Sequence, residues 1–312
     1  MNRCFVSGTT IRTDDVSGQL YLGLGDGPHP GVLVLHGSGG ARGYEQTYAA
    51  LLAEHGYTVL CVEYFGAPGI RDTLLEVPLE EFENAADWLV QHPEVEGDRV
   101  GVVGFSRGGE ASLLIGSHFD TVGVVIAYVP SCYVWPAPSW MDGVGEDQPT
   151  WTFSGKPLAH LSIDSYIYEE DGIDEPLGVE EPNASTLAIA RSTKTEKARA
   201  TIPVEEIDGP VLLVSGGNDT VWPSAVLATR AAARLDAHDH PWRFEHLSFS
   251  EAGHAIRVPY RFDETDDPTS HHQFGGTNGA NAQAAATAWW KALEFLGRGH
   301  TDRNRELNSQ PH

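Results

Sequence analysis

A serine between two glycines is the first residue whose surroundings point to chemistry. The stretch Gly104-Phe105-Ser106-Arg107-Gly108 matches the pattern G-x-S-x-G. It directly follows the apolar run at 100–103 and opens a stretch that reads as a helix. Between a strand and a helix, this pattern holds the serine in a strained turn, with its hydroxyl exposed at the carboxyl end of a sheet. The sequence therefore predicts that Ser106 is a nucleophile.

An acid and a histidine further along could complete a catalytic triad with Ser106. Asp219 comes soon after the apolar run at 211–215, and His254 lies among small residues after the run at 244–249. Taken singly, Asp219 is typical of a turn or a helix cap, and His254 of a loop. Together the three follow the chain order serine, acid, histidine, each after a different predicted strand, as in α/β hydrolases. His254 would take the proton of Ser106, and Asp219 would orient the imidazole ring.

A glycine-rich turn could supply an oxyanion hole. The residues His36-Gly37-Ser38-Gly39-Gly40 follow the first predicted core strand. The backbone N–H groups of Ser38 and Gly39, with that of Arg107 just after the nucleophile, would hold a developing oxyanion. The alternative is a phosphate-binding loop, but the sequence has neither G-x-G-x-x-G nor a P-loop lysine here. We therefore expect no nucleotide cofactor.

The spacing of the histidines and cysteines predicts neither a metal site nor a disulfide framework. The groups His238-Asp239-His240 and His271-His272 lack partner ligands at suitable spacing, so we expect no metal and no cofactor. Three cysteines, Cys4, Cys61 and Cys132, are too few for a disulfide framework, which favours a reducing compartment. The N-terminus has no apolar signal segment, and no apolar run reaches about 18 residues. We expect a cytoplasmic protein without a membrane helix.

The elements that must position these residues alternate along the chain. Strands are predicted at 31–35, 58–62, 100–104, 122–128, 211–215 and 244–249, and helices at 44–54, 79–91, 110–116, 224–237 and 281–296. Such alternation indicates a mostly parallel central sheet with helices on both faces. A length of 312 residues suits one domain of this kind. The predicted fold class is therefore α/β, of the α/β-hydrolase type.

One long stretch, residues 131–205, breaks this alternation. It is rich in proline, tryptophan and acidic residues and shows no clean periodicity, yet a structureless loop of this length is uncommon inside a domain. We expect it to form a cap over one end of the sheet, with Cys132 and Trp135 as candidate substrate contacts. Arg42, beside the glycine-rich turn, is a third candidate. The polar residues 300–312 are expected to be a disordered tail.

Blocks spread over about residues 30 to 298 carry a family resemblance. They include Val77-Pro78-Leu79-Glu80-Glu81-Phe82, Gly104 to Glu110, Ile202-Pro203-Val204-Glu205-Glu206-Ile207, Ala252-Gly253-His254 and Gly275-Gly276-Thr277. In these blocks the chain resembles the C-terminal catalytic domain shared by acyl-CoA thioester hydrolases and bile acid-CoA:amino acid N-acyltransferases. The resemblance implies an α/β-hydrolase fold, with nucleophile, acid and base at Ser106, Asp219 and His254.

Two departures from that family shape the expected function. Its animal members carry an immunoglobulin-like domain before the catalytic one, whereas only about 30 residues precede the first core strand here, so we expect the catalytic domain alone. Its acyltransferases use cysteine as nucleophile, whereas this chain has Ser106, which in the family goes with hydrolysis. We therefore expect a serine hydrolase of acyl-CoA thioesters. A carboxylesterase or dienelactone-hydrolase-like esterase, and an inactive binding protein of this fold, remain as alternatives.

Net charge limits the partners and the solvent. With 44 acidic against 20 basic residues the chain carries −24, and only four of the basic residues are lysines. This excludes a basic surface for nucleic acid or for an anionic membrane. It favours adaptation to high salt, because self-repulsion destabilises a fold when little salt screens it. The same charge repels polyanionic coenzyme A, and we expect Arg42 and Arg107 beside the glycine-rich turn to soften this repulsion.

The melting temperature should rise as KCl is increased from about 0.05 to about 2 M, because the Debye length shortens to roughly 3 Å at 1 M. Activity should peak well above physiological ionic strength. The KM for an acyl-CoA should fall with salt, whereas the KM for a neutral ester should change much less. Thermal denaturation followed by circular dichroism checks the first part, and a melting temperature that stays flat over this range would contradict salt adaptation.

Overall fold

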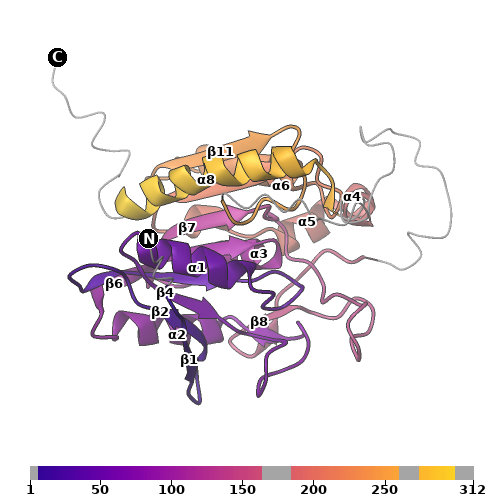
Figure 1. The fold of residues 1–312 in the computed structure, drawn as a ribbon. Coiled ribbons are helices and arrows are strands. Elements are labelled where there is room, and N and C mark those ends of the chain that lie inside the picture. The colour runs from indigo at the N-terminus through magenta and orange to yellow at the C-terminus, as the bar shows by residue number, and fades with distance from the viewer. Residues whose placement is uncertain (1–5, 164–183, 260–273, 299–312) are drawn as a thin grey trace.

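A central sheet organises the molecule. The computed structural model describes residues 6–163, 184–259 and 274–298. In these residues eight strands pair in the order β1-β2-β4-β3-β6-β7-β10-β11 (Figure 1). Neighbours from β4 to β11 are parallel, and β1 and β2 join antiparallel at one edge, which confirms the predicted fold class. The strands are β1 (Thr9–Arg12), β2 (Ser17–Tyr21), β3 (His29–Leu35), β4 (Thr58–Val62), β6 (Val95–Phe105), β7 (Val122–Tyr128), β10 (Val211–Gly216) and β11 (Phe244–Phe249).

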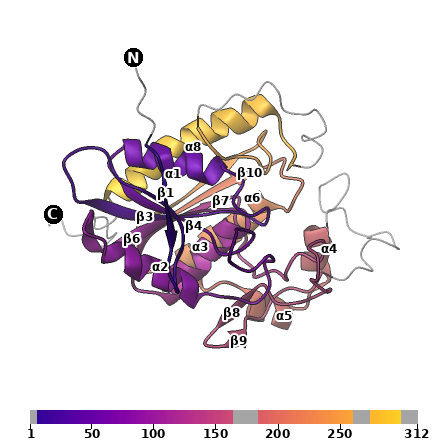
Figure 2. The ribbon, with the colours of Figure 1, turned by 60° about the horizontal axis from the view of Figure 1, so that its bottom comes forward.

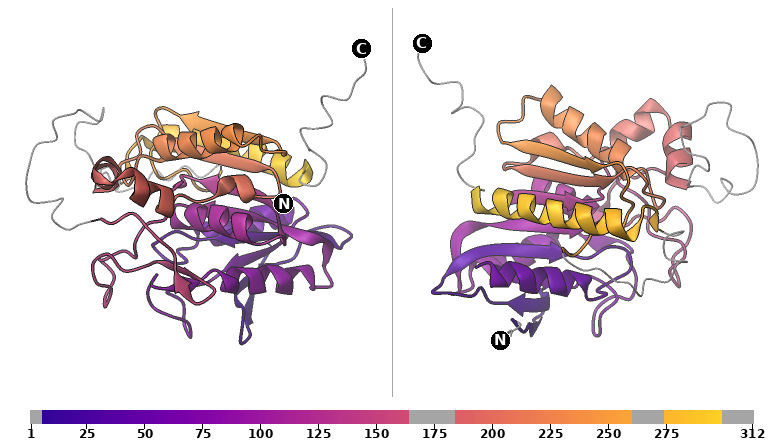
Figure 3. Two further views of the ribbon diagram at one scale, coloured as in Figure 1. Left: turned by 180° about the vertical axis from the view of Figure 1, so that it is seen from behind. Right: turned by 45° about the horizontal axis from the view of Figure 1, so that its top comes forward.

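Helices cover both faces of this sheet (Figure 1 and Figure 3). Successive side chains of a strand point to opposite faces, so each central strand contributes to two cores. In β3, Val32 and Val34 belong to one core, and Leu33 and Leu35 belong to the other. The first core is covered by α1 (Tyr44–Glu54) and α8 (Asn278–Arg298), and the second by α2 (Glu80–Val90), α3 (Arg107–His118) and α6 (Ser224–Ala237).

Five of the eleven predicted elements have the bounds that the sequence indicates. The predicted bounds of β4, β7, β11, α1 and α6 match the structure. Helix α3 begins at Arg107, before the predicted start at 110, because Gly108 and Gly109 are poor helix formers and hide its first turn. The sequence does not predict β1 and β2, since these short edge strands contain too few apolar positions to establish a period.

The stretch at 131–205 leaves the sheet and returns to nearly the same place. Tyr133 and Thr201 form an antiparallel bridge. The N–H of Val134 donates to the carbonyl of Ala200 at 2.8 Å, and that of Ile202 donates to the carbonyl of Cys132 at 2.9 Å. The two ends of the stretch therefore lie side by side, as an insertion between β7 and β10 requires.

Within this stretch the described residues hold more regular structure than the sequence suggests. It contains β8 (Trp151–Phe153), β9 (Lys156–Pro157), α4 (Ala184–Arg191) and α5 (Lys194–Ala200), which gather beyond one end of the sheet (Figure 2). The short 3₁₀ helix η2 (Val204–Glu206) follows at its end and packs against α3 and α6. β8 pairs parallel with β5 (Val77–Pro78) and antiparallel with β9. Helix α5 starts at a capping box formed by Thr193 and Glu196, a local signal that apolar periodicity alone does not reveal.

Two further expectations concern the C-terminal tail and membrane helices. The polar residues 300–312 lie outside them, so the expected tail stays a prediction. Among the helices that the structure describes, none combines the length and the apolar character needed to cross a membrane.

Candidate active site

Ser106 occupies a strained turn between β6 and α3. Its φ of 58° lies in the left-handed region, which is costly for a residue with a side chain. The turn is possible because backbone segments approach very closely on both sides. A Cβ at Gly104 would lie 1.9 Å from the carbonyl oxygen of Gly108, and one at Gly108 would lie 2.4 Å from that of Leu35. Both glycines of the G-x-S-x-G pattern are therefore required by the packing of β3, β6 and α3.

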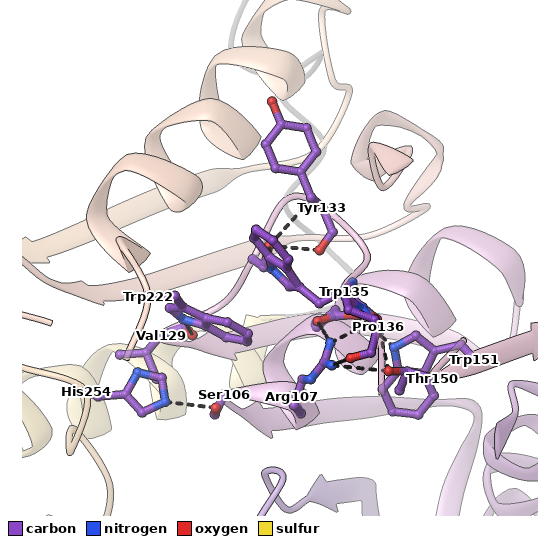
Figure 4. Close-up of polar contacts among 12 residues, drawn as sticks. Ser106, Arg107, Val129, Tyr133, Trp135, Pro136, Thr150, Trp151, Trp222 and His254 are labelled. Atoms are coloured by element: carbon purple, nitrogen blue, oxygen red, sulfur yellow. Dashed lines mark hydrogen bonds and ion pairs between the residues drawn. The ribbon is translucent and has the colours of Figure 1, made fainter. Parts of the chain in front are cut away.

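The structure brings Ser106, His254 and Asp219 into one hydrogen-bonded chain. The Nε2 of His254 lies 2.8 Å from the Oγ of Ser106, and its Nδ1 lies 2.8 Å from the Oδ2 of Asp219 (Figure 4 shows the first contact). The Oδ1 of Asp219 accepts hydrogen bonds from the backbone N–H groups of Val221, at 2.9 Å, and Trp222, at 3.3 Å. The side chains of His254 and Asp219 are only 5% and 1% exposed. The acid is therefore held by the backbone through Oδ1 and contacts the histidine through Oδ2.

A third segment, Phe274 to Gly276, holds the loops of the acid and the histidine together. Asp219 forms an isolated bridge with Gly275, and Ala252 forms one with Gly276. The N–H of His254 donates to the carbonyl of Phe274 at 2.6 Å. At Gly275 φ is +67°, and a Cβ there would lie 1.8 Å from the carbonyl oxygen of Asn218. The family block at 275–277 thus has a positioning role that residue types alone did not reveal.

The glycine-rich turn lies opposite Ser106 and leaves N–H groups open. Ser38 and Gly39 form its tip and line the pocket beside the nucleophile. In the part of the chain that the structure describes, no hydrogen bond takes up the N–H of Ser38, Gly39 or Arg107. His36 stacks on Tyr64 with ring centroids 4.0 Å apart, and burial lowers its pKa to about 4. A neutral, buried His36 therefore braces the base of this turn.

A pocket of about 330 Å³ opens above Ser106. Its wall includes Trp140, a tryptophan from the inserted stretch that is 66% exposed. Of the predicted substrate contacts, Arg42 lines it. The full lining is Gly37, Ser38, Gly39, Gly40, Arg42, Tyr44, Phe105, Ser106, Val129, Trp140, Val221, His254, Ile256, Arg257 and Phe274.

Two predicted substrate contacts do not line this pocket. Cys132 is 4% exposed in the core, and burial raises the pKa of its thiol to about 12. Trp135 is 1% exposed, and its Nε1 donates to the Oγ of Ser131 at 2.8 Å. Both side chains pack in the hydrophobic core, where they stabilise the inserted stretch. Position in the chain suggested a pocket contact, whereas tertiary packing directs these side chains inward.

Arg107 also lies differently from the expectation. Its side chain is 6% exposed and forms an ion pair with Glu110, Nη1 to Oε2, at 2.7 Å. It also donates to the carbonyl of Pro136 and, at 3.1 Å, to the Oγ1 of Thr150 (Figure 4). The guanidinium is therefore taken up inside the protein and cannot soften repulsion of coenzyme A. The backbone N–H of Arg107, without a hydrogen bond in the described residues, stays the candidate oxyanion donor.

Glu110 completes a buried network between the nucleophile helix and the inserted stretch. Its carboxylate accepts from the Nε1 of Trp151 at 2.8 Å and from the backbone N–H of Trp135 at 3.2 Å, in addition to Arg107. Burial raises the pKa of Glu110, and the Arg107 guanidinium opposes that rise. Because both residues belong to the first turn of α3, the network fixes residues 135–151 relative to the turn that holds Ser106.

No metal centre accompanies this arrangement in the described ranges. There, no group of three or more His, Cys, Asp or Glu side chains could hold an ion. His240 lies buried and contacts the carbonyl of Gly209 through Nε2 at 3.1 Å. The pair His271-His272 lies outside the described residues, so the expectation about it stays a prediction.

Comparison with known proteins decides the family. Residues 77–301, more than half of the chain, match the model described as BAAT / Acyl-CoA thioester hydrolase C terminal. The chain belongs to this family. The sequence is 30% identical over 290 residues to human acyl-coenzyme A thioesterase 1. It is 29% identical over 291 residues to mouse acyl-coenzyme A amino acid N-acyltransferase 1. Each match covers 92% of this chain but only 64% of the relative, so the chain spans less than two thirds of these BAAT/thioester hydrolase proteins.

Solved structures support the fold of this BAAT/thioester hydrolase domain. The dienelactone hydrolase-like promiscuous phosphotriesterase from metagenomic libraries superposes with a TM-score of 0.55 at 14% identity, over 93% of this chain and 99% of that chain. The acylaminoacyl peptidase of Pyrococcus horikoshii gives a TM-score of 0.55 at 14% identity, over 94% of this chain and 41% of that chain. At these identities the likeness concerns the fold alone.

Replacing Glu110 by glutamine should lower the free energy of unfolding by about 3–5 kcal/mol, because it leaves a buried guanidinium without its carboxylate. Denaturant unfolding in molar KCl measures this loss. The matched control is Glu81→Gln, which breaks the half-exposed pair of Arg71 and Glu81 and should cost no more than about 1 kcal/mol. Equal losses for the two variants would contradict the structural role of the buried network.

Proposed function

We propose that this chain is a serine hydrolase that cleaves acyl-CoA thioesters through an acyl-enzyme on Ser106. The observation that carries the proposal is the chain of contacts from Ser106 Oγ through His254 to Asp219, 2.8 Å at each step. The thioester substrate is proposed from family membership and from relatives such as human acyl-coenzyme A thioesterase 1.

The first half of the proposed reaction forms the acyl-enzyme. His254 accepts the proton of Ser106 on Nε2 while Oγ attacks the thioester carbonyl carbon. Asp219 accepts a hydrogen bond from the Nδ1–H of His254, which fixes the tautomer and stabilises the imidazolium. The N–H groups of Ser38, Gly39 and Arg107 bind the oxyanion of the tetrahedral intermediate. Its collapse breaks the carbon–sulfur bond, and His254 returns the proton to the leaving thiol.

The second half restores Ser106. His254 takes a proton from a water molecule, which attacks the carbonyl carbon of the acyl-enzyme, and the same N–H groups hold the second oxyanion. Collapse releases the free acid and returns the proton to Ser106. The strained turn supports both halves, because the fixed backbone conformation, with φ of 58°, holds Oγ at the carboxyl end of β6 before the substrate binds.

Ser106→Ala and His254→Ala should each lower kcat for an acyl-CoA by about 10³-fold or more, because the triad acts as one unit. Asp219→Asn should lower it by up to about 10⁴-fold through the wrong histidine tautomer. Release of free thiol, followed with a thiol reagent in molar salt, measures each rate. Thr287→Ala, a change on the surface of α8, is the control and should keep the wild-type rate.

The choice of substrates separates the alternatives. Acyl-CoAs of several chain lengths, and simple esters of the same acids, are compared with one preparation. A kcat/KM for esters far above that for thioesters would identify an esterase instead. An intact protein that cleaves neither and fails to react with an active-site serine probe would overturn the proposal in favour of a binding protein.

A further inference from the structure

Arg257 is a cation in the wall of the pocket, without an ion-pair partner among the described residues. It follows His254 by three residues, and its Cζ lies 4.7 Å from the ring centroid of Tyr44 and 4.9 Å from that of Phe274. Aromatic rings attract a guanidinium without using up its N–H donors. Across the described ranges, no carboxylate lies within 4.0 Å of Arg257 and no acceptor forms a hydrogen bond with it. Its donors are therefore open to a molecule in the pocket.

This lack of a partner stands out in so acidic a chain. Acidic residues outnumber basic ones by 44 to 20, so carboxylates are plentiful. Six other arginines are paired with them in the described structure: Arg12 with Glu63, Arg71 with Glu81, Arg99 with Asp208, Arg107 with Glu110, Arg234 with Glu205, and Arg243 with Glu245 and Glu294. The pocket wall, as far as the structure describes it, contains no acidic side chain.

A second guanidinium makes the same wall more positive. Arg42 lines the pocket, and its Nε donates to the carbonyl of Gly39 at 2.8 Å, which ties it to the glycine-rich turn. The nearest acid, Glu45, is fully buried and accepts from the N–H groups of Arg42 and Gly43 at 3.2 and 3.1 Å. Burial raises the pKa of Glu45, and the charge of Arg257 opposes that rise.

We propose that Arg257, assisted by Arg42, binds an anionic oxygen group of the substrate and thereby sets specificity. The inference rests on the proposed function and adds the recognition of charge to it. A planar guanidinium matches the oxygens of a phosphate or a carboxylate with two parallel hydrogen bonds. An acyl-CoA can present such a group in two places, the phosphates of its nucleotide or a carboxylate at the far end of the acyl chain.

Four thioesters distinguish these two sources. They combine a neutral or an ω-carboxyl acyl group with coenzyme A or with uncharged pantetheine: butyryl-CoA, glutaryl-CoA, S-butyryl-pantetheine and S-glutaryl-pantetheine. KM and kcat are measured for the wild type and for Arg257→Met, which keeps an apolar stem of similar length and removes the charge. Molar KCl is held constant, so that long-range repulsion does not vary between assays.

KM should rise about tenfold or more in Arg257→Met for the substrates that carry the bound anion, since a charge-assisted hydrogen bond is lost. A rise for both CoA thioesters alone identifies the phosphates, and a rise for both glutaryl thioesters alone identifies the acyl carboxylate. Arg257→Lys should recover part of the loss. The control is Arg243→Met at the opposite end of β11, which should leave all four KM values unchanged.

An equal change for all four thioesters, or no change for any, would overturn the proposal, because a merely structural role does not depend on substrate charge. Failure of the proposed function has a separate signature, namely a wild type that cleaves none of the four. In that case the affinities of free coenzyme A and of glutarate are measured instead of KM and kcat, by calorimetric titration into the wild type and into Arg257→Met. Affinity for one of them that falls at least about tenfold in the variant supports the anion site, and equal or absent binding overturns it.

Discussion

The close approach of three backbone segments around Ser106 is the constraint on which the site depends. β3, β6 and the start of α3 meet so tightly that side chains at Gly104 and Gly108 would collide with carbonyl groups. At this contact Ser106 has a φ of 58°, and α3 begins at the next residue, Arg107. Packing of the strands and helices compensates the strain, as expected where a fold holds a residue in a costly conformation. One backbone contact therefore positions both the proposed nucleophile and the candidate oxyanion donor that follows it, the N–H of Arg107.

Asp219 and His254, the other two members of the proposed triad, depend on a second close contact of the same kind. Gly275 and Gly276 pass so near to the loops of Asp219 and His254 that neither could bear a side chain without a clash. The pocket side of the site is fixed differently, by the buried network of Arg107 and Glu110 that holds residues 135–151. Backbone contact thus positions the triad, whereas polar side chains position the inserted stretch around it.

Local patterns were sufficient to predict much of the fold and to select the candidate site residues. Continuous apolar runs marked the parallel strands, because strands buried on both faces need no polar positions. Ser106, Asp219 and His254 could be selected as candidates because each follows such a run. The structure places their side chains in hydrogen-bond contact, and their catalytic roles stay a prediction. The directions of side chains beyond the strands could not be read in this way. Arg107 looked available to a substrate, but the buried carboxylate of Glu110, three positions further along, forms an ion pair with its guanidinium.

Arg257 illustrates the reverse case, since nothing in its sequence neighbourhood marks it. Its place in the pocket follows from the approach of α1 and the segment at Phe274, which are distant in sequence. For the same reason, the sequence of the inserted stretch did not show which of its side chains reach the pocket. Trp140 lines the pocket and Trp135 does not, although both belong to one aperiodic segment. Only tertiary contacts distinguish them.

The measurement that tests the central claim most directly is the mass of the protein during turnover. The enzyme is mixed with an acyl-CoA in molar salt, quenched in acid within milliseconds and analysed by intact-protein and peptide mass spectrometry. The account predicts a transient increase by the mass of one acyl group, located on the peptide that contains Ser106 and absent from Ser106→Ala. Full turnover with no acyl adduct on Ser106 at any time, or an adduct on another residue, would contradict it.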